Sequence, residues 1–253
     1  MIELLKTIWQ IIFGKKEEPP SVLEPETPTD IAPEPEKGFE GASPWTVMDV
    51  SKWQGEINWQ AVKDSGKVHG VMLRIIGEGA YIDPRFEENY ALCKKLGIPV
   101  GGYIFSVATS KEAADKERAL FAKAVKGKTF DLPIALDIES AKLEAIDKAD
   151  LTDLVAYELK ELENLGFYAM LYTYLAFAAN NLYMSGAALS PYDVWLAAYR
   201  KQKPVTDYAY SMWQYTSKAS IPGVNGDVDL STTDRDYVKI IAKKGLNKLK
   251  EGV

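Results

Sequence analysis

Two carboxylic acids at the end of an apolar run are the residues of this chain best suited to acid–base chemistry. The run Leu132-Pro-Ile-Ala-Leu-Asp-Ile-Glu-Ser140 contains Asp137 and Glu139, which an extended strand would place on one face about 7 Å apart. Like charges at that spacing raise the pKa of one group and keep a proton available for general acid catalysis near neutral pH. The alternative is that Asp137 caps a following helix and that Glu139 is solvated.

A third acid lies nearer the amino end of the chain, among aromatic and amide side chains. Asp49 belongs to the run Trp45-Thr-Val-Met-Asp-Val-Ser-Lys-Trp-Gln-Gly55, so Trp53 and Gln54 follow it closely, and the chain holds 6 tryptophans and 14 tyrosines. Aromatic faces stack on sugar rings, while carboxylate and amide groups bind sugar hydroxyls. The mixture predicts a carbohydrate-binding cleft, although any single tryptophan is more often part of a core.

The remaining composition excludes several other kinds of site. The 253 residues contain one histidine, His69, and one cysteine, Cys93, whereas zinc hydrolases take several histidine ligands and a disulfide needs a second thiol. Both residues are expected to be structural, and no metal or organic cofactor is expected. With a net charge of −6 and no basic stripe, the chain is not expected to bind nucleic acid.

Segments of strand length and of helix length alternate along residues 43–237. We expect strands at 46–50, 70–76, 100–105, 134–138, 168–172, 194–198, 211–215 and 227–230, and helices at 59–65, 84–96, 111–125, 148–165 and 174–184. Such alternation predicts a parallel sheet. About eight strands in a chain of this length predict an α/β fold, a modified (β/α) barrel similar to a TIM barrel with fewer helices.

Residues at the carboxyl ends of the strands form the active site in barrels of this kind. The expected strand ends supply mainly acids and aromatic residues: Asp49, Arg74, Tyr103, Phe105, Asp137, Glu139, Tyr172, Trp195, Tyr199, Trp213, Gln214 and Asp229. The predicted elements therefore bring the acids and the aromatic residues to one end of the barrel.

The two ends of the chain differ from this body. Residues 1–14 are apolar except at helically spaced positions, which predicts a helix about 20 Å long, shorter than the ~30 Å hydrocarbon core of a membrane. We expect it to lie on a membrane surface or to dock on a partner protein, the alternative being an incidental helical tail. A linker rich in proline and glutamate follows at 15–42. A basic tail at 238–253 either reaches an anionic wall polymer or phospholipid or is solvated.

Seven short motifs follow one another along the chain: Asp49-Val-Ser-Lys-Trp-Gln-Gly55, Asp83-Pro-Arg-Phe-Glu-Glu-Asn89, Gly97-Ile-Pro-Val-Gly-Gly-Tyr103, Asp137-Ile-Glu139, Trp195-Leu-Ala-Ala-Tyr199, Trp213-Gln-Tyr215 and Val228-Asp-Leu230. Their order resembles that of the family 25 glycoside hydrolases over about residues 45–237. These are bacterial and phage lysozymes that cleave the β-1,4 bond between N-acetylmuramic acid and N-acetylglucosamine in peptidoglycan. The resemblance implies a modified β/α barrel and hydrolysis with retention of configuration.

The resemblance also implies roles for individual residues. Glu139 matches the general acid and base, and Asp137 matches the residue that assists attack by the substrate's N-acetyl group, although a direct carboxylate nucleophile stays open. Asp49 and Asp229 match two further acids of the catalytic cleft. The matching substrate-binding positions are Tyr103, Phe105, Tyr172, Trp195, Tyr199, Gln214 and Arg74.

Two positions depart from the family's pattern. The chain has Ile104-Phe105-Ser106 where the family often has an aromatic or histidine pair, and Arg74 stands where lysine is also common. An arginine keeps the charge of a lysine but not its geometry. The resemblance therefore does not imply how these positions bind sugar.

We expect a peptidoglycan hydrolase that acts on glycan strands of the bacterial cell wall, as a phage endolysin or virion-associated lysin, with a bacterial autolysin as the near alternative. Lys15 and Lys16 follow the apolar run instead of preceding it, which favours synthesis in the host cytoplasm, or association with a virion, over secretion. A second hypothesis is a structural or wall-binding module of a phage tail or wall assembly, with the barrel used for anchoring. The presence of all four acids argues against it.

Overall fold

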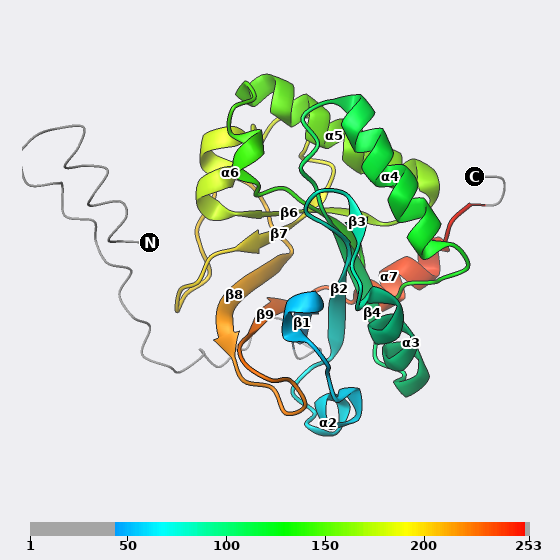
Figure 1. The fold of residues 1–253 in the computed structure, drawn as a ribbon. Helices are drawn as coiled ribbons and strands as arrows, with labels where there is room; N and C mark the ends of the chain where they lie inside the picture. Colours follow the sequence, from blue (N-terminus) through cyan, green and yellow to red (C-terminus); the bar gives the residue numbers. More distant parts are fainter. Residues whose placement is uncertain (1–43, 251–253) are drawn as a thin grey trace, which may run out of the picture. The chain divides into compact units, whose positions relative to one another are not determined.

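The computed structural model describes residues 44–250, which are built around a closed barrel (Figure 1). A nine-stranded sheet has the order β1-β9-β8-β7-β6-β5-β4-β2-β3, and β1 also pairs with β2, which closes the ring and leaves the short β3 (Tyr81–Ile82) outside it. The strands of the ring are β1 (Trp45–Val50), β2 (Gly70–Gly77), β4 (Val100–Phe105), β5 (Ile134–Asp137), β6 (Ala169–Tyr174), β7 (Asp193–Ala197), β8 (Met212–Ala219) and β9 (Val228–Thr233). The expected modified (β/α) barrel is confirmed, and β3 is an addition to it.

One strand of the ring runs against the others. Neighbouring strands are parallel except at β9, which is antiparallel to both β1 and β8, whereas the sequence pattern predicts a parallel sheet throughout. A parallel connection needs a crossover of about a dozen residues or more, usually containing a helix. The link at 220–227 contains no helix, so β9 returns beside β8 as the second arm of a hairpin.

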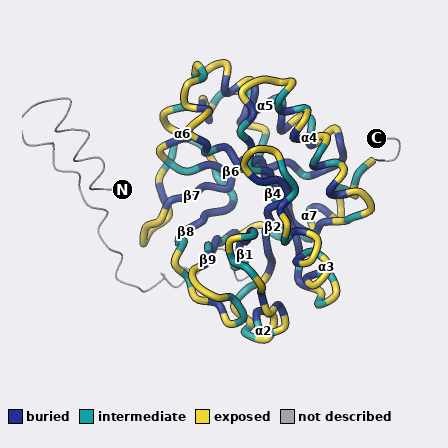
Figure 2. Tube along the Cα trace, in the orientation of Figure 1, coloured by how far each residue is buried: buried dark blue, intermediate teal, exposed yellow. Residues whose placement is uncertain are grey.

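Helices pack on the outside of the ring against β2, β4, β5 and β6, and the strands of the ring are largely buried (Figure 2). The two longest begin after Ser110 and Asp147, whose side chains accept hydrogen bonds from the backbone N–H groups of Ala113 and Ala149. Both occupy the ranges that the sequence predicts, and α4 and α5 pack against β2, β5 and β6. The helices are α2 (Trp59–Asp64), α3 (Phe86–Leu96), α4 (Lys111–Val125), α5 (Lys148–Leu165), α6 (Leu175–Asn181) and α7 (Tyr237–Lys244), with short 3-10 turns η1 (Lys52–Gln54) and η2 (Ala141–Leu143).

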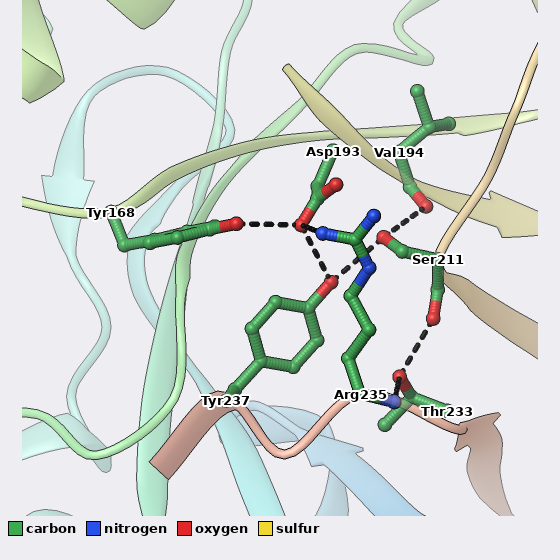
Figure 3. A network of polar contacts seen from close by, with 7 residues as sticks. All are labelled: Tyr168, Asp193, Val194, Ser211, Thr233, Arg235 and Tyr237. Carbon is green, nitrogen blue, oxygen red and sulfur yellow. Dashed lines mark hydrogen bonds and ion pairs between the residues drawn. The ribbon is translucent and has the colours of Figure 1, made fainter. Parts of the chain in front are cut away.

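A polar network joins the starts of β6, β7 and β8 at the end of the barrel that we call the floor (Figure 3). Asp193 Oδ2 accepts hydrogen bonds from the hydroxyl of Tyr168 (2.8 Å), the hydroxyl of Tyr237 (3.0 Å) and Nη1 of Arg235 (3.0 Å). The Tyr237 hydroxyl also lies 2.7 Å from Ser211 Oγ. Tyr237, the first residue of α7, is fully buried, so this network fixes α7 beneath the ring.

The fold continues past Tyr237, where the sequence analysis expects the barrel to end and a basic tail to follow. Asn247 is fully buried, its Nδ2 donates to the carbonyl of Leu132 (2.6 Å), and its Oδ1 accepts from the backbone N–H of Tyr168 (2.6 Å). The N–H of Lys250 donates to the carbonyl of Leu165 (3.0 Å). Residues 238–250 are thus part of the folded unit, because these polar groups complete hydrogen bonds that the barrel itself leaves open.

The expected apolar helix at 1–14 and the linker at 15–42 lie outside the described residues, as do residues 251–253. Within residues 44–250, no helix combines the length and the apolar character that crossing a membrane requires.

Two glutamates from α4 and α5 are buried together on the outer side of the ring. Ser106 Oγ donates to Glu158 Oε2 (3.1 Å), and the N–H of Val107 donates to Glu117 Oε1 (3.2 Å). The second oxygen of each carboxyl group has no partner among residues 44–250. Burial, and then the charge of Glu117, raises the pKa of Glu158 to about 8. The pair therefore retains a proton at neutral pH in the folded protein.

We expect Glu158→Gln to stabilise the protein near pH 8 and to change its stability much less near pH 5. An unfolded glutamate has a pKa of about 4.3, whereas the folded one keeps its proton up to about 8. The native state thus binds more protons than the unfolded state, and wild-type stability falls as the pH rises through that window. Thermal unfolding of both proteins across this range measures the effect, since each kcal/mol moves the midpoint by about 2–4 °C. Identical pH slopes for the two proteins would contradict the prediction.

Candidate active site

A cleft of about 310 Å³ opens at the strand carboxyl ends, the mouth of the barrel. All the acids and substrate-binding residues that the sequence analysis selects line this first hollow: Asp49, Arg74, Tyr103, Phe105, Asp137, Glu139, Tyr172, Trp195, Tyr199, Gln214 and Asp229. The lining also includes Val50, Ser51, Trp53 and Gln54, which directly follow Asp49 in the chain. Their place in that motif was the available signal, and of the four only Trp53 and Gln54 are of types that bind sugars through a ring or an amide.

Trp213, which the expected strand ends also supply, does not line this hollow. Its indole Nε1 donates to the carbonyl of Ala198 (2.8 Å), and its side chain is buried. Successive residues of a strand point to opposite faces. Because the side chain of Gln214 points into the barrel, the side chain of the preceding Trp213 points outward.

The strands place the four acids by register. Asp49 on β1 lies directly opposite Asp229 on β9, and Asp137 ends β5 between Phe105 of β4 and Tyr172 of β6. The N–H of the next residue, Ile138, still donates to the Tyr172 carbonyl (2.9 Å). The extended backbone therefore continues past the strand, which keeps Glu139 on the same side as Asp137.

Asp137 does not cap the helical turn that follows it. The side chain of Ser140 performs that role by accepting a hydrogen bond from the N–H of Lys142 at the start of η2. Asp137 is buried, and its Oδ1 has no hydrogen-bond partner among the described residues. Burial and the charges of Glu139 and Asp49 raise its pKa well above the usual range, against the opposing effect of Arg74. Asp137 Oδ1, which accepts no hydrogen bond from the described residues, is available to accept one from a substrate N–H.

The other acids also hold their protons more firmly than free carboxyl groups. Burial, followed by the charge of Asp229, raises the pKa of Glu139. Burial raises the pKa of Asp229 to about 6, and burial with the charge of Asp229 raises the pKa of Asp49 well above its usual range. Glu139 is only half buried, so it combines a raised pKa with access to a ligand, as a general acid requires.

Gln214 joins three of the cleft residues and is itself buried. Its Nε2 donates to Asp49 Oδ2 (2.9 Å), and its Oε1 accepts from the hydroxyl of Tyr172 (3.0 Å) and lies 3.1 Å from that of Tyr199. The Tyr199 hydroxyl is also 3.5 Å from Asp229 Oδ1. One amide thus fixes the orientation of Asp49 and of two tyrosines that border the acids.

Arg74 reaches the cleft from a buried ion pair. Its Nε donates to Asp83 Oδ2 (2.7 Å), while its Nη2 is buried without a partner among residues 44–250. Asp83 also accepts hydrogen bonds from the N–H groups of Lys52 (3.1 Å) and Arg85 (2.9 Å). The fork of an arginine permits this division, because one nitrogen can hold Asp83 while the others face the cleft. Asp83 opens one of the sequence motifs, yet its positioning role was not predicted.

The aromatic residues of the cleft divide into buried and exposed members. Trp195 is buried, packs edge to face with Tyr172 at 4.6 Å between ring centroids, and donates from Nε1 to Ser231 Oγ (2.8 Å). Trp53 and Tyr199 are 76% and 53% exposed. The exposed rings present faces on which a sugar can stack.

A second hollow of about 380 Å³ adjoins the first at the mouth. Glu139, Tyr172 and Tyr199 line both, while the second adds Tyr174, Leu175, Ala176, Ala197, Ala198 and Arg200. Glu139 therefore stands at the junction of two spaces, each bordered by tyrosine rings. Within residues 44–250, no group of three or more His, Cys, Asp or Glu side chains is arranged to hold a metal ion.

A family model described as "Glycosyl hydrolases family 25" matches residues 48–224. Among curated proteins, "Uncharacterized protein YegX" from Escherichia coli (strain K12) is 30% identical over 192 residues, which cover 73% of this chain and 67% of that protein. The "Autolytic lysozyme" of Clostridium acetobutylicum is 28% identical over 183 residues, which cover 72% of this chain and 54% of that protein.

Among solved structures, the modular autolysin LytC from Streptococcus pneumoniae, in complex with a synthetic peptidoglycan ligand, has a TM-score of 0.68 at 23% identity. The alignment covers 77% of this chain and 47% of LytC. This chain therefore spans about half the length of the autolytic lysozyme and of LytC. At 23% identity, the likeness to LytC shows a shared fold.

Proposed function

Because this chain belongs to family 25 of the glycosyl hydrolases, we propose that its cleft cleaves the β-1,4 bond between N-acetylmuramic acid and N-acetylglucosamine, with Glu139 as general acid and base. Membership of the family makes the chain a glycoside hydrolase of the lysozyme type, whose substrate is the peptidoglycan of the bacterial cell wall. The observation that carries the residue assignment is the place of Glu139 at the junction of the two hollows, beside Asp137.

The two hollows suggest how the substrate lies. Asp137 lines the first hollow and not the second. A sugar whose N-acetyl group contacts Asp137 therefore occupies the first hollow, and we place N-acetylmuramic acid there. Glu139 then faces the bond to be broken, and the leaving N-acetylglucosamine occupies the second hollow.

The proposed reaction has two steps. Protonated Glu139 gives its proton to the glycosidic oxygen while the carbonyl oxygen of the N-acetyl group attacks the anomeric carbon, and the bond to the leaving sugar breaks. A water molecule then attacks the same carbon, gives a proton to the Glu139 carboxylate and opens the ring formed in the first step. Glu139 regains its starting form, and two inversions at one carbon retain the β configuration.

Asp137 supports the first step as a hydrogen-bond acceptor for the N-acetyl N–H. Its Oδ1 has no competing donor among the described residues, and the charge of Arg74 favours the carboxylate form that accepts this N–H. Positive charge develops on the N-acetyl group as it attacks, so a carboxylate at this position stabilises the transition state more than the bound substrate.

Digestion of purified peptidoglycan with the full chain tests this proposal. The fragments are reduced with borohydride and identified by mass spectrometry, beside peptidoglycan incubated without protein. We expect muramitol at every new reducing end. New ends that carry reduced glucosamine instead would contradict the proposed bond, and undigested peptidoglycan from several kinds of wall would contradict the proposed activity.

Residues 1–14 bear on where the enzyme acts from. We propose a phage lysin that reaches the wall from the host cytoplasm or from a virion, with residues 1–14 as its attachment to a membrane surface or a partner protein. The support is the apolar sequence of that segment, which lies outside the described residues. Flotation of the full chain with liposomes tests the membrane attachment, because a protein that stays at the bottom of the gradient does not bind the lipid surface.

A further inference from the structure

Arg200 is the cationic residue that lines the second hollow. It follows β7 through Ala198 and Tyr199 and is exposed. No ion pair or hydrogen bond joins its side chain to another residue between 44 and 250. Arg74 in the first hollow differs, because Asp83 already holds part of its guanidinium group. Within the described residues, no side chain competes with a ligand for the donors of Arg200.

Charge is distributed unevenly between the two hollows. Asp49, Asp137 and Asp229 line the first hollow only, where Arg74 is the one cation among the described residues, whereas the second contains Arg200 and shares Glu139 with the first. In the second hollow a substrate anion would meet a guanidinium group that has no partner among residues 44–250. An anionic part of the leaving segment is thus favoured on the side of Arg200.

Peptidoglycan carries its anionic groups at defined positions. N-acetylglucosamine is neutral, whereas the lactyl group of each muramic acid bears a stem peptide with free carboxylates. In the orientation proposed above, the leaving N-acetylglucosamine lies in the second hollow, and the next sugar beyond it is another muramic acid. The stem peptide of that muramic acid is the nearest anionic group on the leaving side.

We propose that Arg200 binds a carboxylate of the stem peptide on the leaving-group side of the cleft and thereby selects glycan strands with anionic stems. This inference rests on the proposed function and adds to it a determinant of substrate choice. A guanidinium group suits this task, because its planar fork matches the two oxygens of a carboxylate. Arg200 acts on binding of the leaving segment and not on the proton transfers at Glu139.

The test uses two defined tetrasaccharide substrates that differ only in the stem peptide of the muramic acid on the leaving-group side. One stem carries free carboxylates and the other carries carboxamides at the same positions. Wild type is expected to have a kcat/KM about three- to fivefold higher for the anionic substrate, the size of one exposed ion pair. Arg200→Gln is expected to lose this preference, so that its kcat/KM values for the two substrates become equal. Arg200→Lys, which keeps the charge without the fork, should keep part of it.

Lys201→Gln is the matched control, because Lys201 is the next residue, is exposed and does not line the hollow. It should behave as wild type with both substrates. The inference is overturned if Lys201→Gln removes the preference as Arg200→Gln does, or if wild type cleaves both substrates at the same rate. If wild type cleaves neither substrate, the proposed function itself fails, so the two failures are distinguishable.

Discussion

Glu139→Gln is expected to reduce turnover of peptidoglycan by about 10²–10⁴-fold, the usual contribution of a positioned general acid. The amide has nearly the same shape as the acid but can neither give a proton to the glycosidic oxygen nor take one from water. Glu139 is only half buried at the mouth of the barrel, so the change removes little packing. The variant should therefore unfold at a temperature close to that of wild type.

The measurement is the initial rate on solubilised glycan strands, beside a thermal unfolding curve. Glu144→Gln supplies the control, because Glu144 lies on the same loop, is exposed and lines neither hollow. Near-wild-type turnover by Glu139→Gln would remove Glu139 from its assigned role. A substrate with an acidic phenol as its leaving group adds a second readout. Because this group departs without a proton, the first step should be least impaired with that substrate.

Asp137→Asn is expected to lower kcat by about 10²–10³-fold, comparable to the loss of one preorganised group that stabilises transition-state charge. The asparagine oxygen can still accept the N-acetyl N–H, so KM should change little. What disappears is the negative charge opposite the positive charge that develops during attack. Burying a carboxyl group without a partner for Oδ1 is unfavourable, so the variant should be at least as stable as wild type.

A thiazoline analogue of the cyclic intermediate separates the two mechanisms open for Asp137. If the N-acetyl group is the nucleophile, wild type should bind this analogue much more tightly than a simple N-acetylated sugar, and Asp137→Asn should lose that gain. A covalent sugar adduct on Asp137, trapped with a slow substrate and found by mass spectrometry, would contradict participation of the N-acetyl group. Full activity of the variant would contradict both mechanisms.

The sequence predicts most reliably the elements that are decided by neighbouring residues. The ranges of α4 and α5 agree with the prediction because capping residues, Ser110 and Asp147, stand immediately before strongly periodic runs. The strand at 100–105 also agrees. The direction of β9 could not be taken from its own residues, since an alternating strand looks the same in either direction. The informative feature is the link between β8 and β9, which is too short for the helical crossover that a parallel strand would need.

The membership of the cleft was predictable, while the contacts within it were not. Strand ends converge in any closed barrel, so an acid or aromatic residue at a strand end is placed at the mouth by topology alone. The Arg74–Asp83 ion pair and the buried pair of Glu117 and Glu158 depend on which helix packs where. The second hollow was not predicted, because the expected elements assign Tyr174 to the helix at 174–184 and Arg200 lies beyond the strand at 194–198, whereas β6 extends to Tyr174.

The reversed direction of β9 also has a consequence for engineering. Trp45 at the start of β1 pairs with Thr233 at the end of β9. After α7, which ends at Lys244, the chain continues to Lys250, whose N–H donates to the carbonyl of Leu165 at the end of α5. Residues 44 and 250, the two ends of the described region, therefore both lie at the floor of the barrel, away from the cleft at its mouth. Fusion partners or solid supports attached at either boundary would leave the catalytic face free to lie against an extended, insoluble polymer.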